Sequence, residues 1–167
     1  QHQPIALVHF DAHSDTWEDD GSRIDHGTMF YQAAKTGIVD PSRSIQIGMR
    51  THNENTRGYQ VLDARWLHRH GIDRAVEAIK ARVGGNSCYL TFDIDFIDPA
   101  FAPGTGTPVV GGFDTHTALE LIRGLAGIRI IGADVVEVSP PYDHAETTAL
   151  AGASIAQEIL GIIAVAR

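Results

Sequence analysis

Apolar residues fall in short runs along the chain, and polar or helix-forming segments separate them. Most of these runs are rich in β-branched and other apolar residues, which is typical of strands buried in a parallel sheet. The predicted strands cover residues 5–10, 44–49, 61–62, 88–92 and 128–133. His9 is the one polar side chain in the first of them.

The segments between these runs contain apolar residues at helical spacing, which predicts helices. Several of these segments are preceded by a residue type that commonly caps helices. The predicted helices begin at Thr28, Asp73, Asp114 or Thr115, and about Thr148. Residues 149–166 form the most apolar stretch, but Gln157 and Glu158 interrupt it. We therefore predict a packed terminal helix there rather than a membrane span.

The alternation of strand and helix predicts one α/β domain over residues 1–167. Helices would cover both faces of a mostly parallel sheet, in a three-layer α/β/α arrangement. The hydrophobic content of 43% and charged content of 20% are ordinary for a globular protein. A formal net charge of −8 argues against a nucleic-acid-binding surface and against a basic membrane-binding face.

Cys88 is the single cysteine, so we expect no internal disulfide and a reducing, cytoplasmic location. The first residues do not show the basic and then apolar pattern of a signal peptide. A strand of the buried type so close to the first residue predicts that the natural protein continues upstream. We therefore interpret the chain as a fragment.

Acidic residues cluster at the carboxyl ends of predicted strands. Asp11, His13 and Asp15 follow the first strand, and Asp93 and Asp95 follow the fourth, each at a spacing of two residues. In extended backbone, residues two apart point to the same side, so each cluster would direct its ligand atoms to one point. Carboxyl ends of parallel strands share one edge of the sheet, where ligands bind. Close carboxylates resist joint ionisation, and a cation between them removes that cost.

The ligand types indicate manganese. Four carboxylates with one imidazole suit Mn²⁺ better than zinc, which favours nitrogen and sulfur, or calcium, which avoids histidine. Two divalent ions would offset four aspartates, and a water between them would lose its proton near neutral pH. Glu137 follows the last predicted strand and adds a further carboxylate at the same edge.

Several segments resemble the signatures of the arginase and agmatinase ureohydrolases. Residues 11–15 read Asp-Ala-His-Ser-Asp, and residues 93–99 read Asp-Ile-Asp-Phe-Ile-Asp-Pro, with Pro-Gly-Thr-Gly-Thr-Pro shortly after. Residues 134–143 read Asp-Val-Val-Glu-Val-Ser-Pro-Pro-Tyr-Asp. The resemblance runs over nearly the whole chain and implies an arginase-like fold. Residues 25–31 and 46–51 make the chain most similar to the bacterial agmatinases.

The resemblance implies a site with two Mn²⁺ ions. Asp11 and Asp93 would bridge the ions, Asp15 would bind one of them, and the other would be bound by His13 and Asp95. Asp15 would also act in catalysis. The family carries a further metal-binding histidine in an upstream Gly-Gly-Asp-His segment that this sequence lacks, and its whole members are much longer. The chain is therefore similar to the C-terminal part of a ureohydrolase.

The resemblance also implies the substrate and the reaction. Glu137 would pair with the guanidinium group of a small substrate, and His26 would transfer protons. A metal-bridging hydroxide would attack the guanidinium carbon, so that agmatine gives urea and putrescine, as in polyamine biosynthesis. The family usually forms homo-oligomers, either trimers or hexamers.

The identity of the substrate stays open between two classes. Arginases carry asparagine where this chain has Trp17, which speaks against an α-amino acid and suits agmatine or a guanidino acid. The acidic residues Glu18, Asp19 and Asp20 favour a cationic end, as in agmatine. The alternatives are a guanidino-acid hydrolase, for example a guanidinobutyrase, and a non-catalytic chain that retains the fold. A zinc deacetylase of similar architecture fits the second aspartate pair poorly.

Overall fold

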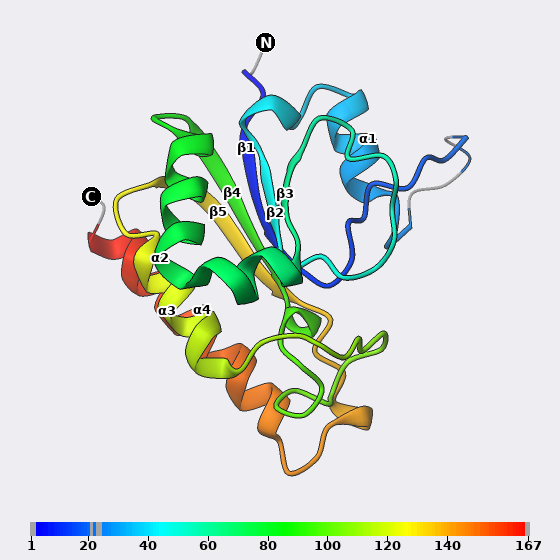
Figure 1. Cartoon of the computed structure of the whole chain (residues 1–167), viewed down its shortest axis with the longest axis vertical. Helices are drawn as coiled ribbons and strands as arrows, with labels where there is room; N and C mark the ends of the chain where they lie inside the picture. The colour runs from blue at the N-terminus through cyan, green and yellow to red at the C-terminus, as the bar shows by residue number, and fades with distance from the viewer. Residues whose placement is uncertain (1–2, 21, 23–24, 166–167) are drawn as a thin grey trace.

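The computed structural model describes residues 3–20, 22 and 25–165. Within them, five strands form a sheet in the order β3-β2-β1-β4-β5, and every neighbouring pair is parallel. The strands are β1 (Ala6–Phe10), β2 (Ile45–Ile47), β3 (Gln60–Leu62), β4 (Ser87–Asp93) and β5 (Arg129–Val136). The predicted parallel sheet is therefore confirmed (Figure 1).

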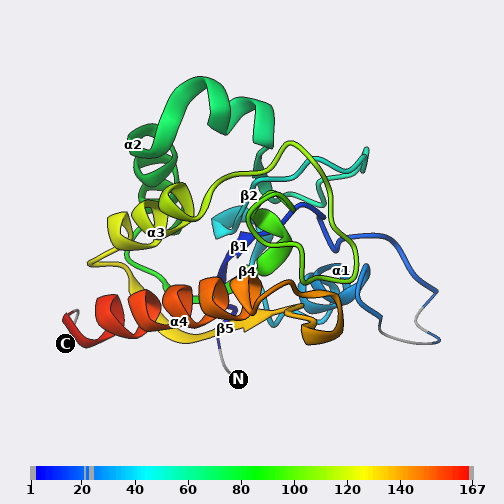
Figure 2. The same cartoon turned by 90° about the horizontal axis from the view of Figure 1, so that it is seen from below.

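Helices lie on both faces of this sheet. They are α1 (Met29–Lys35), α2 (Ala64–Val83), α3 (Thr115–Gly124) and α4 (Thr147–Val165). In Figure 2, α2, α3 and α4 lie on one side of the sheet and α1 on the other. The side chains of β1 divide accordingly: Val8 and Phe10 join the large core under α2, α3 and α4, whereas Leu7 packs with Phe30 of α1. The predicted three-layer arrangement is confirmed.

The register between β1 and β4 determines which residues meet at the carboxyl edge of the sheet. Phe10 at the end of β1 pairs with Phe92 of β4 and with Ile47 of β2. Every residue of β1 is buried, so a shift of one position would exchange its two packed faces. Asp11 and Asp93, which directly follow the paired phenylalanines, therefore leave the sheet side by side.

The start of α2 differs from the prediction. The helix begins at Ala64, where the Asp63 side chain accepts a hydrogen bond from the backbone nitrogen of Trp66, and not at Asp73. Gly71 interrupts it with φ of 78° and ψ of 178°, and Asp73 lies just beyond this break. The sequence prediction missed the part of the helix before Gly71 and placed only the part after it, because the glycine separates the helical pattern into two parts. The predicted starts of α1 after Thr28 and of α3 after Asp114 are confirmed.

The terminal helix α4 is amphipathic in its packing although it is apolar in composition. Ala151, Ile155 and Ile159 are buried in the core with residues of α3 and of the sheet. Leu150 and Leu160 on the opposite side are exposed. Its length and its mean hydropathy of 1.6 are sufficient for a membrane span, and 33% of that apolar window is buried in the fold. Residue 166, which the sequence prediction included in this helix, lies outside the described residues.

Candidate metal and substrate site

Buried carboxylates converge where β1 and β4 end. Asp11 follows β1, Asp93 ends β4, and Asp95 lies in η2 (Ile94–Phe96), the 3₁₀ turn after β4. Asp11 and Asp95 are 1% exposed, and Asp93 is 6% exposed. The Asp93 Oδ1 atom accepts a hydrogen bond from the Asp95 backbone nitrogen at 2.9 Å. A turn therefore brings this pair together, and the predicted extended geometry was wrong.

The segment after β1 also turns. The backbone nitrogen of His13 donates to Asp11 Oδ1 at 2.6 Å, and Asp15 has a φ of 51°. The extended geometry was wrong here too, because aspartate side chains readily bond the backbone two residues further on. The predicted convergence nevertheless holds. The Nδ1 atom of His13 lies 2.9 Å from Asp95 Oδ2 and 3.3 Å from Asp11 Oδ1.

Among the residues that the structure describes, two groups of side chains are close enough to hold a metal ion. The candidate ligand atoms of Asp11, His13 and Asp95 lie within 4.8 Å of one another, and so do those of His9, Asp11 and Asp15. Asp11 belongs to both groups and therefore connects them. The sequence analysis assigned no role to His9, because the spacing of a single histidine inside a predicted strand does not indicate a metal ligand.

Burial and mutual repulsion disfavour the charged forms of most of these carboxylates. Burial, assisted by the charge of Asp11, raises the pKa of Asp15 to about 7 and that of Asp93 to about 10. Burial also raises the pKa of Asp11, but the adjacent His9 and His13 lower it more, so its pKa falls below the ordinary value. Hydrogen bonds with Asp11 and Asp95 raise the pKa of His13 to about 10. This electrostatic pattern favours a bound cation.

A cavity of about 240 Å³ opens above these carboxylates. The predicted site residues that line it are Asp11, His13, Asp15, His26, Asp93 and Glu137. Trp17, Gly27 and Thr107 complete the lining. Asp95 lies behind the cavity wall, where it accepts hydrogen bonds from the Ala12 backbone and from the Thr107 hydroxyl at 3.0 and 3.4 Å. Gly27 and Thr107 were missed by the sequence analysis, because neither residue type carries a specific signal.

Glu137 and His26 meet at the rim of the cavity. The Nδ1 atom of His26 lies 2.9 Å from Oε1 of Glu137, although the two residues are 111 positions apart. The side chain of Glu137 is 33% exposed and that of His26 is 88% exposed. Glu137 directly follows β5 with a φ of 65°, a left-handed conformation that non-glycine residues seldom adopt.

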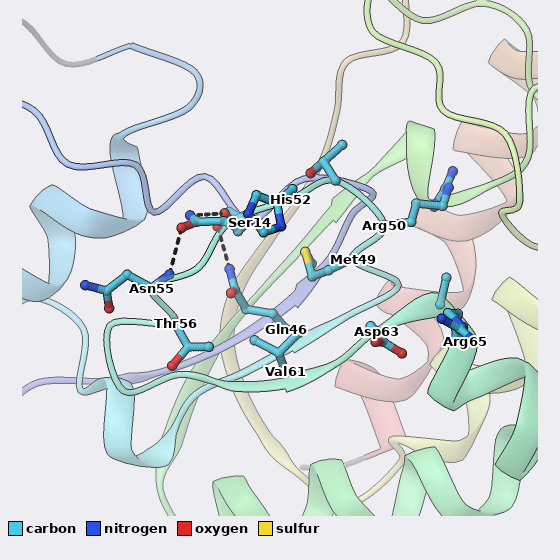
Figure 3. Close-up of a pocket in the computed structure, with 13 residues that line it drawn as sticks. Ser14, Gln46, Met49, Arg50, His52, Asn55, Thr56, Val61, Asp63 and Arg65 are labelled. Atoms are coloured by element: carbon cyan, nitrogen blue, oxygen red, sulfur yellow. Dashed lines mark hydrogen bonds between the residues drawn. The ribbon is translucent and has the colours of Figure 1, made fainter.

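A second cavity of about 410 Å³ lies at the carboxyl ends of β2 and β3, and Figure 3 shows its lining. Ser14 and Gln46 are part of its wall, whereas none of the predicted metal or catalytic residues is. Arg50 also lines it, but its guanidinium donates to the backbone oxygens of Asp95 and Val109 at 2.5 and 2.8 Å. This arginine therefore supports the turn after β4 and is not available as an anion-binding group.

Comparison with known proteins agrees with the geometry. The model of the arginase family matches residues 1–161. The chain belongs to the arginase family. An agmatinase from Proteus mirabilis is 56% identical over 156 residues, and the match covers 93% of this chain and 51% of that protein. An agmatinase from Chromobacterium violaceum is 52% identical, with coverage of 95% and 49%. The chain spans about half the length of the curated relatives it matches.

Solved structures show the same arginase-family fold. A hypothetical agmatinase from Burkholderia thailandensis superposes with a TM-score of 0.94 at 55% identity, covering 96% of this chain and 51% of that one. Proclavaminate amidino hydrolase from Streptomyces clavuligerus gives 0.95 at 40% identity, with coverage of 99% and 57%. The predicted family and the predicted arginase-like α/β fold are both confirmed.

We expect the metal-free arginase-family protein to lose stability as the pH rises from about 5 to about 8. Asp15, Asp93 and His13 have raised pKa values, so the folded state keeps protons that the unfolded chain has released. Such stabilisation is complete below the unfolded pKa and is lost as the pH approaches the folded pKa. The contribution of Asp11, whose pKa is lowered, stays constant across this range.

The measurement is urea unfolding of chelator-treated protein at both pH values, where the free energy of unfolding should fall by at least about 2 kcal/mol. Saturating Mn²⁺ should remove most of this fall, because the cations replace the protons. Constant or increasing stability of the metal-free protein between the two pH values would contradict the electrostatic description of the site.

Proposed function

We propose that the protein hydrolyses the guanidinium group of agmatine to putrescine and urea, using two Mn²⁺ ions. The observation that carries this proposal is the convergence of buried aspartates and His13 beneath a cavity that Glu137 borders. The names of similar proteins, agmatinases at 52% and 56% identity, support the same substrate. The chain spans about half of those relatives, so the activity is proposed for the complete protein.

The donor set fits manganese. Carboxylate oxygens with imidazole nitrogen suit Mn²⁺, and neither of the two metal-binding groups contains a sulfur ligand of the kind typical of structural zinc sites. The residues that would hold the two ions are Asp11, His13, Asp15, Asp93 and Asp95. When bound, the ions supply Lewis-acid chemistry that makes water a strong nucleophile near neutral pH.

Glu137 is the carboxylate of the cavity that remains for the substrate. The other carboxylates that line the cavity, Asp11, Asp15 and Asp93, are those proposed to hold the ions, so bound cations would leave the charge of Glu137 uncompensated. A planar guanidinium forms two parallel, charge-assisted hydrogen bonds with a carboxylate. The left-handed backbone of Glu137 agrees with this role, because strained conformations concentrate at ligand-binding sites. We infer that Glu137 holds the guanidinium with its carbon above the buried aspartates.

His26 is placed to move protons between this pocket and solvent. Its ring contacts Glu137 at 2.9 Å, and most of its side chain is exposed. Histidine changes its charge near neutral pH, so it can deliver a proton to the leaving amine and recover one from water.

A guanidino acid is the second candidate substrate. The name of proclavaminate amidino hydrolase, a structure with 40% sequence identity to this chain, combines a carboxylate with an amidino group and supports this candidate. In addition, the acidic side chain of Glu18 forms an ion pair with Arg57 at 2.8 Å and is therefore partly neutralised. The acidic stretch thus supports an ammonium-ended substrate less than its composition predicts. The relatives at 52% and 56% identity are named agmatinases, and these names still favour agmatine.

The substrate is tested by urea release from the complete protein with Mn²⁺, comparing agmatine, arginine and 4-guanidinobutyrate. We expect kcat/KM for agmatine to exceed the other two by at least about tenfold, or about 1.4 kcal/mol in transition-state binding. Chelator-treated protein should release no urea. A preference for 4-guanidinobutyrate would favour the guanidino-acid hydrolase, and no urea from any substrate would favour the non-catalytic alternative.

Substitution of Glu137 tests the substrate anchor. Glu137→Gln keeps the shape but removes the charge, and loss of such a hydrogen-bonded charge pair costs about 2–5 kcal/mol. We expect kcat/KM for agmatine to fall roughly 30-fold to several thousand-fold, with unchanged manganese content. Glu77→Gln is the matched control, because Glu77 pairs with Arg74 on the exposed side of α2. A change under about threefold in Glu137→Gln, equivalent to less than 1 kcal/mol, would remove Glu137 from guanidinium binding.

Substitution of His26 tests proton transfer. His26→Asn should lower kcat by roughly 100-fold or more, as expected when a general acid or base is lost, and leave metal content unchanged. The control is His52→Asn, since His52 is similarly exposed and also lies beside a carboxylate, that of Glu54. Equal activity of the two variants would show that His26 has no part in the reaction.

A further inference from the structure

His9 is a buried histidine with both ring nitrogens engaged. It lies on β1, two residues before Asp11, and is 1% exposed. Its Nε2 atom lies 2.7 Å from Asp11 Oδ2, and its Nδ1 atom lies 3.0 Å from the side-chain nitrogen of Gln46. Gln46 is the register partner of His9 on β2, so the sheet itself brings the two side chains together.

The orientation of the Gln46 amide determines which nitrogen of His9 carries the proton. The amide nitrogen lies 2.5 Å from the carbonyl oxygen of Ser14, which can only accept a hydrogen bond. The opposite orientation would place two acceptor oxygens together. The amide therefore donates one hydrogen to Ser14 and the other to His9 Nδ1. Because Nδ1 accepts, the proton of His9 lies on Nε2 and is donated to Asp11.

The geometry points to His9 as a positioning residue that orients the Asp11 carboxylate for metal binding. The inference rests on the metal site of the proposed function. Oδ2 of Asp11 is held by His9, and Oδ1 is held by the backbone nitrogen of His13 at 2.6 Å. With a donor on each oxygen, the carboxylate has a defined orientation before an ion binds. Oδ2 retains a second lone pair for a metal, whereas Oδ1 also lies 3.3 Å from Nδ1 of His13.

Direct metal binding by His9 is the competing assignment, because His9, Asp11 and Asp15 form one of the two candidate groups. A metal-binding nitrogen must present a free lone pair. The lone pair of Nδ1 faces Gln46, and Nε2 carries the proton. The ring of Phe30, with its centroid 4.5 Å from that of His9, packs against the imidazole and restricts a reorientation.

Two variants of the complete protein separate the roles of the two nitrogens. In His9→Gln, the amide nitrogen takes the place of Nε2 and still donates to Asp11, whereas the shorter side chain of His9→Asn reaches only the place of Nδ1. We expect the Mn²⁺ dissociation constant of chelator-treated protein to rise about 10- to 100-fold in His9→Asn. His9→Gln should stay within about threefold of the unchanged protein, since it keeps the outer hydrogen bond.

Equal weakening in both variants, or in neither, would overturn the inference. Histidine ¹⁵N NMR of the metal-free protein provides a readout that requires no variant to bind metal. The signals of His9, identified by their loss in His9→Gln, should show a proton on Nε2 and none on Nδ1. A proton on Nδ1 would contradict the assignment.

Failure of the proposed function is distinguishable from failure of this inference. If Mn²⁺ binding follows the expected order of the variants but no substrate releases urea, the activity is rejected and the role of His9 stands. If urea is released and both variants bind Mn²⁺ as the unchanged protein does, the activity stands and the role of His9 is rejected. A complete protein that binds no Mn²⁺ rejects both.

Discussion

Repulsion among buried carboxylates is the constraint on which the site depends. β1 and β4 are neighbours in the sheet, and the pairing of Phe10 with Phe92 makes Asp11 and Asp93 leave it at the same point. Backbone donors offset part of the cost, since Asp95 accepts from Ala12 and Asp93 caps the turn that contains Asp95. Hydrogen bonds of this kind do not neutralise the charge. Cations do, and the arrangement is therefore one that a metal stabilises.

Contacts outside the cavity hold this edge of the sheet in place. Arg50 connects the turn after β4 with the loop before α3, because it donates to backbone oxygens in both segments. Gly48 permits this close packing. Its φ is 96°, and a Cβ atom there would meet the ring of Phe96 and lie 2.9 Å from the backbone oxygen of Asp11. The position of the predicted metal ligands thus depends on neighbouring residues that have no predicted role in metal binding or catalysis.

The site divides into a buried floor and an exposed rim. The floor consists of carboxylates held by short hydrogen bonds, whereas the rim carries Trp17, His26 and Glu137. Trp17 is 49% exposed, and its backbone nitrogen donates to the carbonyl of Gly27 at 2.9 Å, so one loop folds back to form much of the rim. With the proposed substrate, the guanidinium would lie between Glu137 of the rim and the carboxylates of the floor, and its opposite end would lie near Trp17.

The sequence by itself determined the α/β class, because strands covered on both faces leave runs of apolar residues that local inspection detects. Together with the family resemblance, it also predicted the acidic residues and histidines that line the cavity, since aspartate pairs are unusual directly after buried strands, but it did not predict Gly27 and Thr107. It did not predict how the acidic residues converge. The extended geometry expected for Asp93 and Asp95 is replaced by a turn, in which one side chain bonds the backbone of the other.

Only the tertiary structure decided the contacts between distant segments. His9 and Gln46 are 37 positions apart and meet because β1 and β2 pair in one register. His26 and Glu137 are 111 positions apart and meet because a loop and the end of β5 border the same cavity. Strand and helix signals extend over a few neighbouring residues. Strand register and side-chain hydrogen bonds depend on the packing of the whole chain, so no local pattern encodes them.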